Sequence, residues 1–189
     1  MAPWKKVGSR EIYRAQTPDE ISVVSDQIEL AGGARFNYVF AHSPYEVVFV
    51  VGIDPGGNMI LLRQHRYLAE DYLIEIPAGS PNDGESLEDG ARREFEEEAG
   101  YSVGRLEKIA EFFPSIGITD QINHVYVGWD LRETRQRLEK TEDISSFRVS
   151  IDEAVDMVYE GKIISGGAAY SILRAARWWE TMMAPPGKS

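Results

Sequence analysis

The chain has 189 residues, of which 43% are hydrophobic, and a formal net charge of −11 at pH 7. Its length predicts one core fold with elaborations, and its negative charge argues against a protein that binds duplex nucleic acid, which requires a basic surface. The longest strongly apolar run, residues 47–53, is far shorter than a membrane span, and the absence of cysteine excludes disulfides and thiolate chemistry. We therefore expect a cytoplasmic protein with no membrane or nucleic-acid partner.

The first third of the chain is predicted to form β-strands. Segments rich in β-branched and aromatic residues alternate there with turns that contain glycine or proline. The predicted strands cover residues 21–30, 35–40, 45–53 and 59–67, with a short apolar segment at 72–76. We expect hairpins, with residues 1–45 as a strand-rich extension before a main domain over residues 46–184.

The next segment, GSPNDGESLEDGARREFEEEAGY from Gly79 to Tyr101, has the most specific pattern in the chain. Its spacing is G-x5-E-x7-R-E-U-x-E-E-x-G-U, where U is a bulky apolar residue. The fixed positions are Gly79, Glu85, Arg93, Glu94, Glu97, Glu98 and Gly100. A solvated acidic surface would explain a run of glutamates, but it would not require the glycines and the arginine at their positions.

A helix over residues 86–99 would give this spacing a structural purpose. Glu94, Glu97 and Glu98 are related as i, i+3 and i+4, so their carboxylates would line one helix face beside an apolar row that packs. Ser86 is a typical N-cap, and Gly100 suits the position just beyond the C-terminus. The sequence thus predicts both an acidic face and the limits of the helix.

The acidic face predicts a site for a divalent cation. Carboxylates crowded on one face repel one another and raise each other's pKa, a cost that a bound cation would remove. Ligands that are all oxygen atoms favour Mg²⁺ or Mn²⁺. Arg93 is expected to pair with Glu97 one turn later and with Glu85, and so to orient the ligands without touching substrate.

The remainder of the chain is predicted to contain two more strands and two helices. The strands cover residues 103–113 and 122–131 and are joined by a turn-rich connector at 114–120. One helix begins after the N-cap Ser150, runs to Tyr159 and is closed by Gly161, and a second covers residues 167–182. The last five residues, 185–189, are expected to fray. This order of elements predicts an α/β fold, a sandwich in which the acidic helix packs on a mixed sheet.

The pattern from Gly79 to Tyr101 resembles the Nudix box, the signature of hydrolases that split a diphosphate linked to another moiety. The resemblance implies an α/β/α sandwich of the Nudix type. It also implies that the carbonyl oxygen of Ala78 binds metal together with the box glutamates. Gly79 would then allow tight backbone geometry in the loop that feeds the helix.

Flanking residues are similar to the ADP-ribose pyrophosphatase branch of this family. They are EIPAG at 75–79, EAGY at 98–101 and FFPSIGITD at 112–120. The branch usually has a second proline in the connector, where this chain has Ile116. The resemblance implies hydrolysis of ADP-ribose, while the departure keeps other nucleoside diphosphate sugars, such as an ADP- or GDP-sugar, as alternatives. The products would be a nucleoside monophosphate and a sugar phosphate.

The branch also implies roles for residues outside the box. A glutamate from a loop after the last core strands helps to position or deprotonate the attacking water, and Glu142 is the first candidate here, with Glu139 the second. Arg66 at the end of a strand is expected to contact the substrate phosphates, since a guanidinium suits that role. N-terminal strands commonly mediate dimerisation in this branch, so we expect a homodimer.

Two other functions are compatible with parts of the sequence. A nucleoside triphosphate or dinucleoside polyphosphate pyrophosphatase would use the same box. A sensor that binds nucleotide sugars without cleaving them would be expected to have an eroded box and an added DNA-binding segment, and this chain retains every acid of the box.

Overall fold

The structure is a computed structural model that describes residues 3–16 and 21–183. Contacts divide the chain into two compact units, Met1–Glu46 with Phe112–Ile122, and Val47–Glu111 with Asn123–Ser189. The turn-rich connector at residues 114–120 is therefore part of the N-terminal unit, which the sequence did not indicate. The expected frayed tail, residues 185–189, lies outside the described residues.

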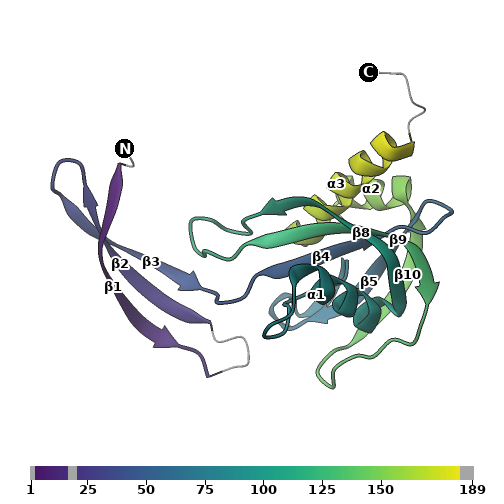
Figure 1. Cartoon of the computed structure of the whole chain (residues 1–189), viewed down its shortest axis with the longest axis horizontal. Helices are drawn as coiled ribbons and strands as arrows, with labels where there is room; N and C mark the ends of the chain where they lie inside the picture. The colour runs from purple at the N-terminus through teal and green to yellow at the C-terminus, as the bar shows by residue number, and fades with distance from the viewer. Residues whose placement is uncertain (1–2, 17–20, 184–189) are drawn as a thin grey trace. The chain divides into compact units, whose positions relative to one another are not determined.

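The N-terminal unit is built on an antiparallel sheet in the order β1-β2-β3 (Figure 1). Its strands are β1 (Trp4–Arg14), β2 (Ser22–Leu30) and β3 (Arg35–His42). The second and third strands were predicted. Strand β1 was not predicted, because its charged sequence shows no clear alternation, and its pairing with β2 contains two register shifts. The connector joins this unit through the N–H of Ala41, which donates to the Ile118 carbonyl at 2.8 Å, and through an ion pair between His42 and Asp120.

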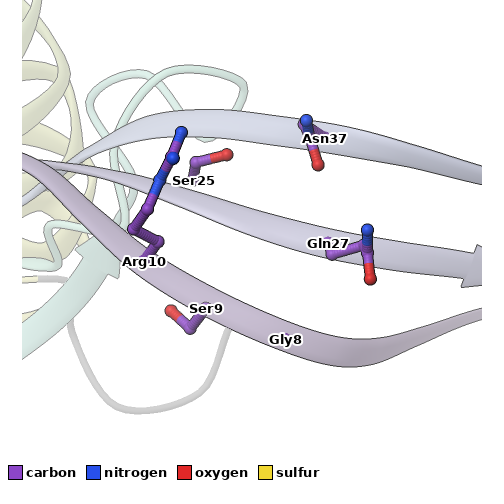
Figure 2. A pocket seen from close by; sticks show the side chains of 6 residues that line it. All are labelled: Gly8, Ser9, Arg10, Ser25, Gln27 and Asn37. Atoms are coloured by element: carbon purple, nitrogen blue, oxygen red, sulfur yellow. The ribbon is translucent and has the colours of Figure 1, made fainter.

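One face of this sheet has a polar hollow of about 320 Å³. Figure 2 shows the six residues that line it, with Arg10 extending from β1 beside Ser25 of β2. The lining residues are Gly8, Ser9, Arg10, Ser25, Gln27 and Asn37. The sheet also exposes large apolar side chains, including those of Trp4, Tyr13 and Val39.

The main unit contains two sheets. The first has the order β7-β4-β9-β8 and consists of β7 (Ala78–Gly79), β4 (Val47–Gly52), β9 (Asn123–Glu133) and β8 (Tyr101–Phe112). Because β4 runs parallel to β9 and antiparallel to β7, this sheet is mixed. The second has the order β10-β5-β6, with β10 (Ile144–Ser150), β5 (Asn58–Arg66) and β6 (Asp71–Glu75) in antiparallel pairs.

Helices cover both faces of the mixed sheet (Figure 1). The acidic helix consists of α1 (Leu87–Glu94) and the π turn η2 (Phe95–Ala99), and the later helices are α2 (Ile151–Tyr159) and α3 (Gly166–Met183). Val48 and Val50 of β4 pack in one core cluster with Phe95, while Val51 packs in a second cluster with Ile172 of α3. Neighbouring residues of one strand thus face opposite helical layers. The predicted α/β/α sandwich with a mixed sheet is confirmed.

Three local details complete the fold. The predicted loop at residues 77–79 contains the two-residue strand β7, because Ala78 and Gly79 pair with Phe49 and Val48 of β4. Trp178 packs on Trp129 with ring centroids 5.2 Å apart. Within the described residues, no helix is both long and apolar enough to span a membrane.

Candidate active site

The acidic helix has the limits that its sequence predicts. At its start, Ser86 Oγ accepts the backbone N–H of Asp89 at 3.1 Å. At its end, Gly100 has a φ of 77°, in the left-handed region that glycine adopts without strain. The last turn, Phe95–Ala99, is a π turn instead of the α-helix that we predicted, and such turns are frequent at functional sites.

The C-terminal end of this helix is fixed by the segment that follows β9. The N–H of Arg137 donates to the Glu97 carbonyl at 2.9 Å, and Gln136 Nε2 donates to the Glu98 carbonyl at 2.6 Å. These bonds satisfy carbonyl groups that a helix end leaves without partners. They also attach the start of the loop over residues 138–143 to the acidic helix, a contact that the sequence did not predict.

Glu98 is a buried carboxylate, with only 5% of the residue exposed. Its Oε2 accepts the backbone N–H of Ala78 at 2.9 Å. Burial, assisted by the charges of Glu94 and Glu142, raises the pKa of Glu98 to about 8, although the hydrogen bond from Ala78 acts in the opposite direction. A buried carboxylate with a raised pKa beside other carboxylates is typical of a functional site.

Glu94 lies directly over Gly79. A Cβ atom at Gly79 would be 2.3 Å from Glu94 Cδ and 2.4 and 2.5 Å from the two carboxylate oxygens. Gly79 is therefore needed because the carboxylate of Glu94 occupies the space that a side chain at residue 79 would fill. The φ of Gly79 is not in the left-handed region, so backbone conformation is not the reason for the glycine. Burial is the main cause that raises the pKa of Glu94.

Arg93 makes the two ion pairs that the spacing predicted. Its guanidinium donates to Glu85 at 3.1 to 3.2 Å, to Glu97 at 3.1 Å and to Glu94 at 2.9 Å, and it also donates to the carbonyl of Ser80 at 2.9 Å. Burial opposes its charge, but these acceptors outweigh burial and raise the pKa of Arg93. One guanidinium thus joins three acids of the pattern and the loop that precedes the helix.

Arg66 forms an ion pair with Glu75 across the β5–β6 hairpin. Its Nε and Nη2 both lie 2.7 Å from Glu75 Oε2. Glu75 is 7% exposed, whereas nearly half of the Arg66 side chain is exposed. The sequence indicated Arg66 but missed its partner, because nothing in the motif EIPAG says which side chain its glutamate contacts.

Of the two candidate acids in the loop, Glu142 is the one whose charge acts on the acidic helix. After burial, its charge contributes to the raised pKa of both Glu94 and Glu98. Glu139 is exposed, and its N–H donates to the Glu142 carboxylate at 2.8 Å. The Glu142 N–H donates in turn to the Glu139 carbonyl at 3.1 Å, which closes a tight turn.

These elements coincide with a known family. The NUDIX domain model matches residues 44–165, which contain the acidic helix and the loop that carries Glu142. The chain belongs to the Nudix domain family. The α/β/α sandwich and the retained acids of the Nudix box agree with this membership, and they identify the protein as a Nudix hydrolase.

Individual relatives and a solved structure agree with the Nudix assignment. The chain is 29% identical over 170 residues to a Bacillus subtilis protein named ADP-ribose pyrophosphatase, covering 89% of this chain and 90% of that protein. It is 29% identical over 161 residues to the methanol dehydrogenase activator of Bacillus methanolicus, covering 84% and 85%. A crystal structure described as ADP compounds hydrolase superposes with a TM-score of 0.84 at 19% identity, covering 95% of this chain and 96% of that one, which shows the shared fold.

The residues of the Nudix box fit a divalent cation. Among the described residues, no cationic side chain lies within ion-pair distance of buried Glu98, so its charge lacks a direct counter-ion. In the same part of the chain, no three acidic or histidine side chains already converge as a complete metal cage. Mg²⁺ does not require one, because it keeps several waters and usually binds one or two carboxylates. A closed cage of three side chains is therefore not needed for the box carboxylates to hold this cation.

Proposed function

We propose that this Nudix protein hydrolyses the diphosphate bond of ADP-ribose or a related nucleoside diphosphate sugar, with a nucleoside monophosphate and a sugar phosphate as products. The observation that carries the proposal is buried Glu98, a carboxylate that forms no direct ion pair with any cation of the described residues and on which the charges of Glu94 and Glu142 act. A diphosphate is itself anionic, so an acidic site of this kind needs a cation to bind it. The similarity to the Bacillus subtilis ADP-ribose pyrophosphatase supports the choice of substrate.

We propose Mg²⁺ or Mn²⁺ as the cofactor, with the Glu94, Glu97 and Glu98 carboxylates and the Ala78 carbonyl oxygen as its ligands. When bound, the cation would neutralise phosphate oxygens and make a water easier to deprotonate. Arg93 supports this arrangement from one side, since it hydrogen-bonds both Glu94 and Glu97. Gly79 supports it from the other side by leaving room for the Glu94 carboxylate.

We assign the general base to Glu142. A general base must lie near the proton that it accepts, and the charge of Glu142 acts on the two most buried acids of the box. Glu139 is the second candidate, because it belongs to the same tight turn.

Arg66 is proposed to contact the substrate phosphates. Its partly exposed guanidinium is already oriented by Glu75, and the action of its charge on Glu98 supports this role. A guanidinium held by one carboxylate can still donate its remaining N–H groups to phosphate oxygens.

We propose a cytoplasmic homodimer formed through the N-terminal strands. Exposed apolar side chains on this sheet, such as those of Trp4, Ile12 and Tyr13, are typical of a surface that binds another protein. The same sheet carries the polar hollow beside Arg10, whose lining residues offer hydrogen-bonding groups (Figure 2). Sedimentation of the full chain and of a Trp4→Ser, Tyr13→Ser double variant would test the interface, with dissociation of the variant as the expected result.

A substrate screen tests the proposed reaction. The purified protein would be incubated with ADP-ribose, ADP-glucose, GDP-mannose, a dinucleoside polyphosphate and nucleoside triphosphates, each with Mg²⁺, with Mn²⁺ and with a chelator, and products would be separated by chromatography. We expect a nucleoside monophosphate and a sugar phosphate from at least one diphosphate sugar, only when the cation is present. Inorganic pyrophosphate released from triphosphates would instead support the alternative pyrophosphatase. Binding of a nucleotide sugar without any product would support the sensor.

A further inference from the structure

We propose that Tyr72 is a positioning residue for Glu142, and that it acts by holding the neighbouring residue Asp143. The inference rests on the proposed function, in which Glu142 works beside Glu94 and Glu98. Tyr72 lies outside the Nudix box, on β6, and no part of the proposed chemistry yet gives it a role.

Strand register brings Tyr72 and Asp143 into one row. His65 of β5 pairs directly with Tyr72 of β6. On the other side of β5, the last pair with β10 is Ile144 with Gln64, and the His65 N–H extends this ladder by donating to the Asp143 carbonyl at 3.2 Å. Asp143, just before β10, His65 of β5 and Tyr72 of β6 therefore lie in one row.

The side chain of Tyr72 crosses this row and holds Asp143. Its hydroxyl donates a hydrogen bond to Asp143 Oδ2. The ring itself is held on two sides, by an edge-on contact with His65 at 5.3 Å between centroids and by the Arg63 guanidinium 3.6 Å from the ring centre. Because the ring is fixed by these contacts, its hydroxyl is directed at Asp143 before any substrate binds.

The contact restrains Glu142 because Asp143 is its immediate neighbour in the chain. Glu142 closes the tight turn with Glu139, and Asp143 connects this turn to Ile144, the first residue of β10. Ile144 packs in the core cluster that contains Phe95 of the acidic helix. The charge of Glu142 acts on Glu94 and Glu98 of the same helix. Holding the Asp143 side chain therefore restrains the backbone that carries Glu142.

The remaining contacts of the turn are local. The bonds between Glu139 and Glu142 close the turn on itself, but they do not attach it to the sheet. Without the Tyr72 hydroxyl, the Asp143 side chain would lose this hydrogen bond, and among the described residues the His65 N–H would remain as the donor that holds Asp143 to β5. A hydrogen bond to a carboxylate of this kind is worth about a factor of ten in an equilibrium between held and released states.

The variant Tyr72→Phe tests the inference, because it keeps the ring contacts with Arg63 and His65 and removes only the hydroxyl. Tyr67→Phe is the matched control, since that tyrosine lies on the adjoining turn η1 (Tyr67–Ala69) and is 83% exposed. Its hydroxyl forms no hydrogen bond with the described residues. Hydrogen exchange of peptides that cover residues 138–144 would be measured together with kcat and KM on the best nucleoside diphosphate sugar.

For Tyr72→Phe we expect hydrogen exchange in residues 138–144 to become about tenfold faster and kcat to fall about tenfold. KM should stay within about twofold of wild type, because Tyr72 does not touch substrate. Tyr67→Phe should match the wild-type protein in both measurements. Unchanged exchange in Tyr72→Phe would overturn the tether, and faster exchange with unchanged kcat would overturn its role in positioning Glu142. If the wild-type protein cleaved no substrate, the proposed function would fail, while the exchange measurement would still decide whether the tether exists.

Discussion

The substitution Gly79→Ala tests the geometry of the acidic site with a single methyl group. A Cβ atom there would lie 2.3 Å from Glu94 Cδ, whereas ordinary van der Waals contact begins near 3.4 Å. The Glu94 carboxylate would therefore have to retreat by roughly 1 Å, and a misplacement of that size at a catalytic site costs about 100-fold in rate. This factor corresponds to about 2.7 kcal/mol in the activation barrier. The fold should persist, because the obstructed atoms are the end of a flexible side chain and alanine is compatible with β7.

The assay is the cation-dependent hydrolysis rate, measured beside thermal unfolding and Mn²⁺ binding. Gly166→Ala is the matched control, since a Cβ at that glycine meets no atom within 4 Å. We expect Gly79→Ala to lose about 100-fold in kcat/KM and to bind Mn²⁺ more weakly, with a melting temperature close to that of wild type. A folded Gly79→Ala variant with wild-type turnover and Mn²⁺ affinity would refute the claim that Glu94 must occupy this space.

Three further predictions concern the charges around the site. Arg93→Gln should lower the free energy of unfolding in urea by roughly 2–3 kcal/mol, because it leaves three acids without their shared partner. The control Arg177→Gln breaks an exposed pair with Glu180 and should cost less than about 0.5 kcal/mol. Equal losses in the two variants would contradict the proposal that Arg93 braces the acids. Because the pKa of Glu98 is raised, the metal-free folded state binds an extra proton between pH 4.5 and about 8, and the free energy of unfolding should fall as pH rises through that window. This fall should shrink when Mg²⁺ or Mn²⁺ is added, or when Glu98 is replaced by Gln. A stability profile that does not depend on the cation would count against a cation at Glu98. Glu142→Gln should lower kcat by about 10² to 10⁴, while Glu139→Gln should stay within about threefold of wild type, and the opposite ranking would exchange their roles.

The acidic helix could be predicted from the sequence because its determinants are local. Ser86 and Gly100 mark its ends through contacts within one turn, and Arg93 meets Glu97 at a fixed helical separation. The mixed sheet followed from short apolar strands separated by turns. By contrast, β1 has few local signals, because its charged sequence shows no clear alternation, and its pairing with β2 contains two register shifts.

Site details that depend on how elements dock could not be predicted. The sequence suggested that Gly79 allows tight backbone geometry, but the structure shows that it makes room for Glu94, which depends on where the helix packs. The partnership of Arg66 with Glu75 requires the register of β5 and β6. Likewise, the sequence ranked Glu142 before Glu139 only through the family resemblance, whereas the action of the Glu142 charge on Glu98 depends on how the loop docks.

The most direct test of the central claim, that this Nudix site works through a cation held at Glu98, is the hydrolysis rate of Glu98→Gln. Glutamine keeps an acceptor for the Ala78 N–H and resembles the protonated carboxyl that burial favours, so the variant should fold normally. Glu96→Gln is the control on the same helix, because within the described part of the chain Glu96 forms a single ion pair, with Arg137 at 3.5 Å. We predict that Glu98→Gln loses about 10³-fold in cation-dependent turnover while Glu96→Gln retains wild-type activity. A folded Glu98→Gln protein that hydrolyses a nucleoside diphosphate sugar at the wild-type rate would contradict the account.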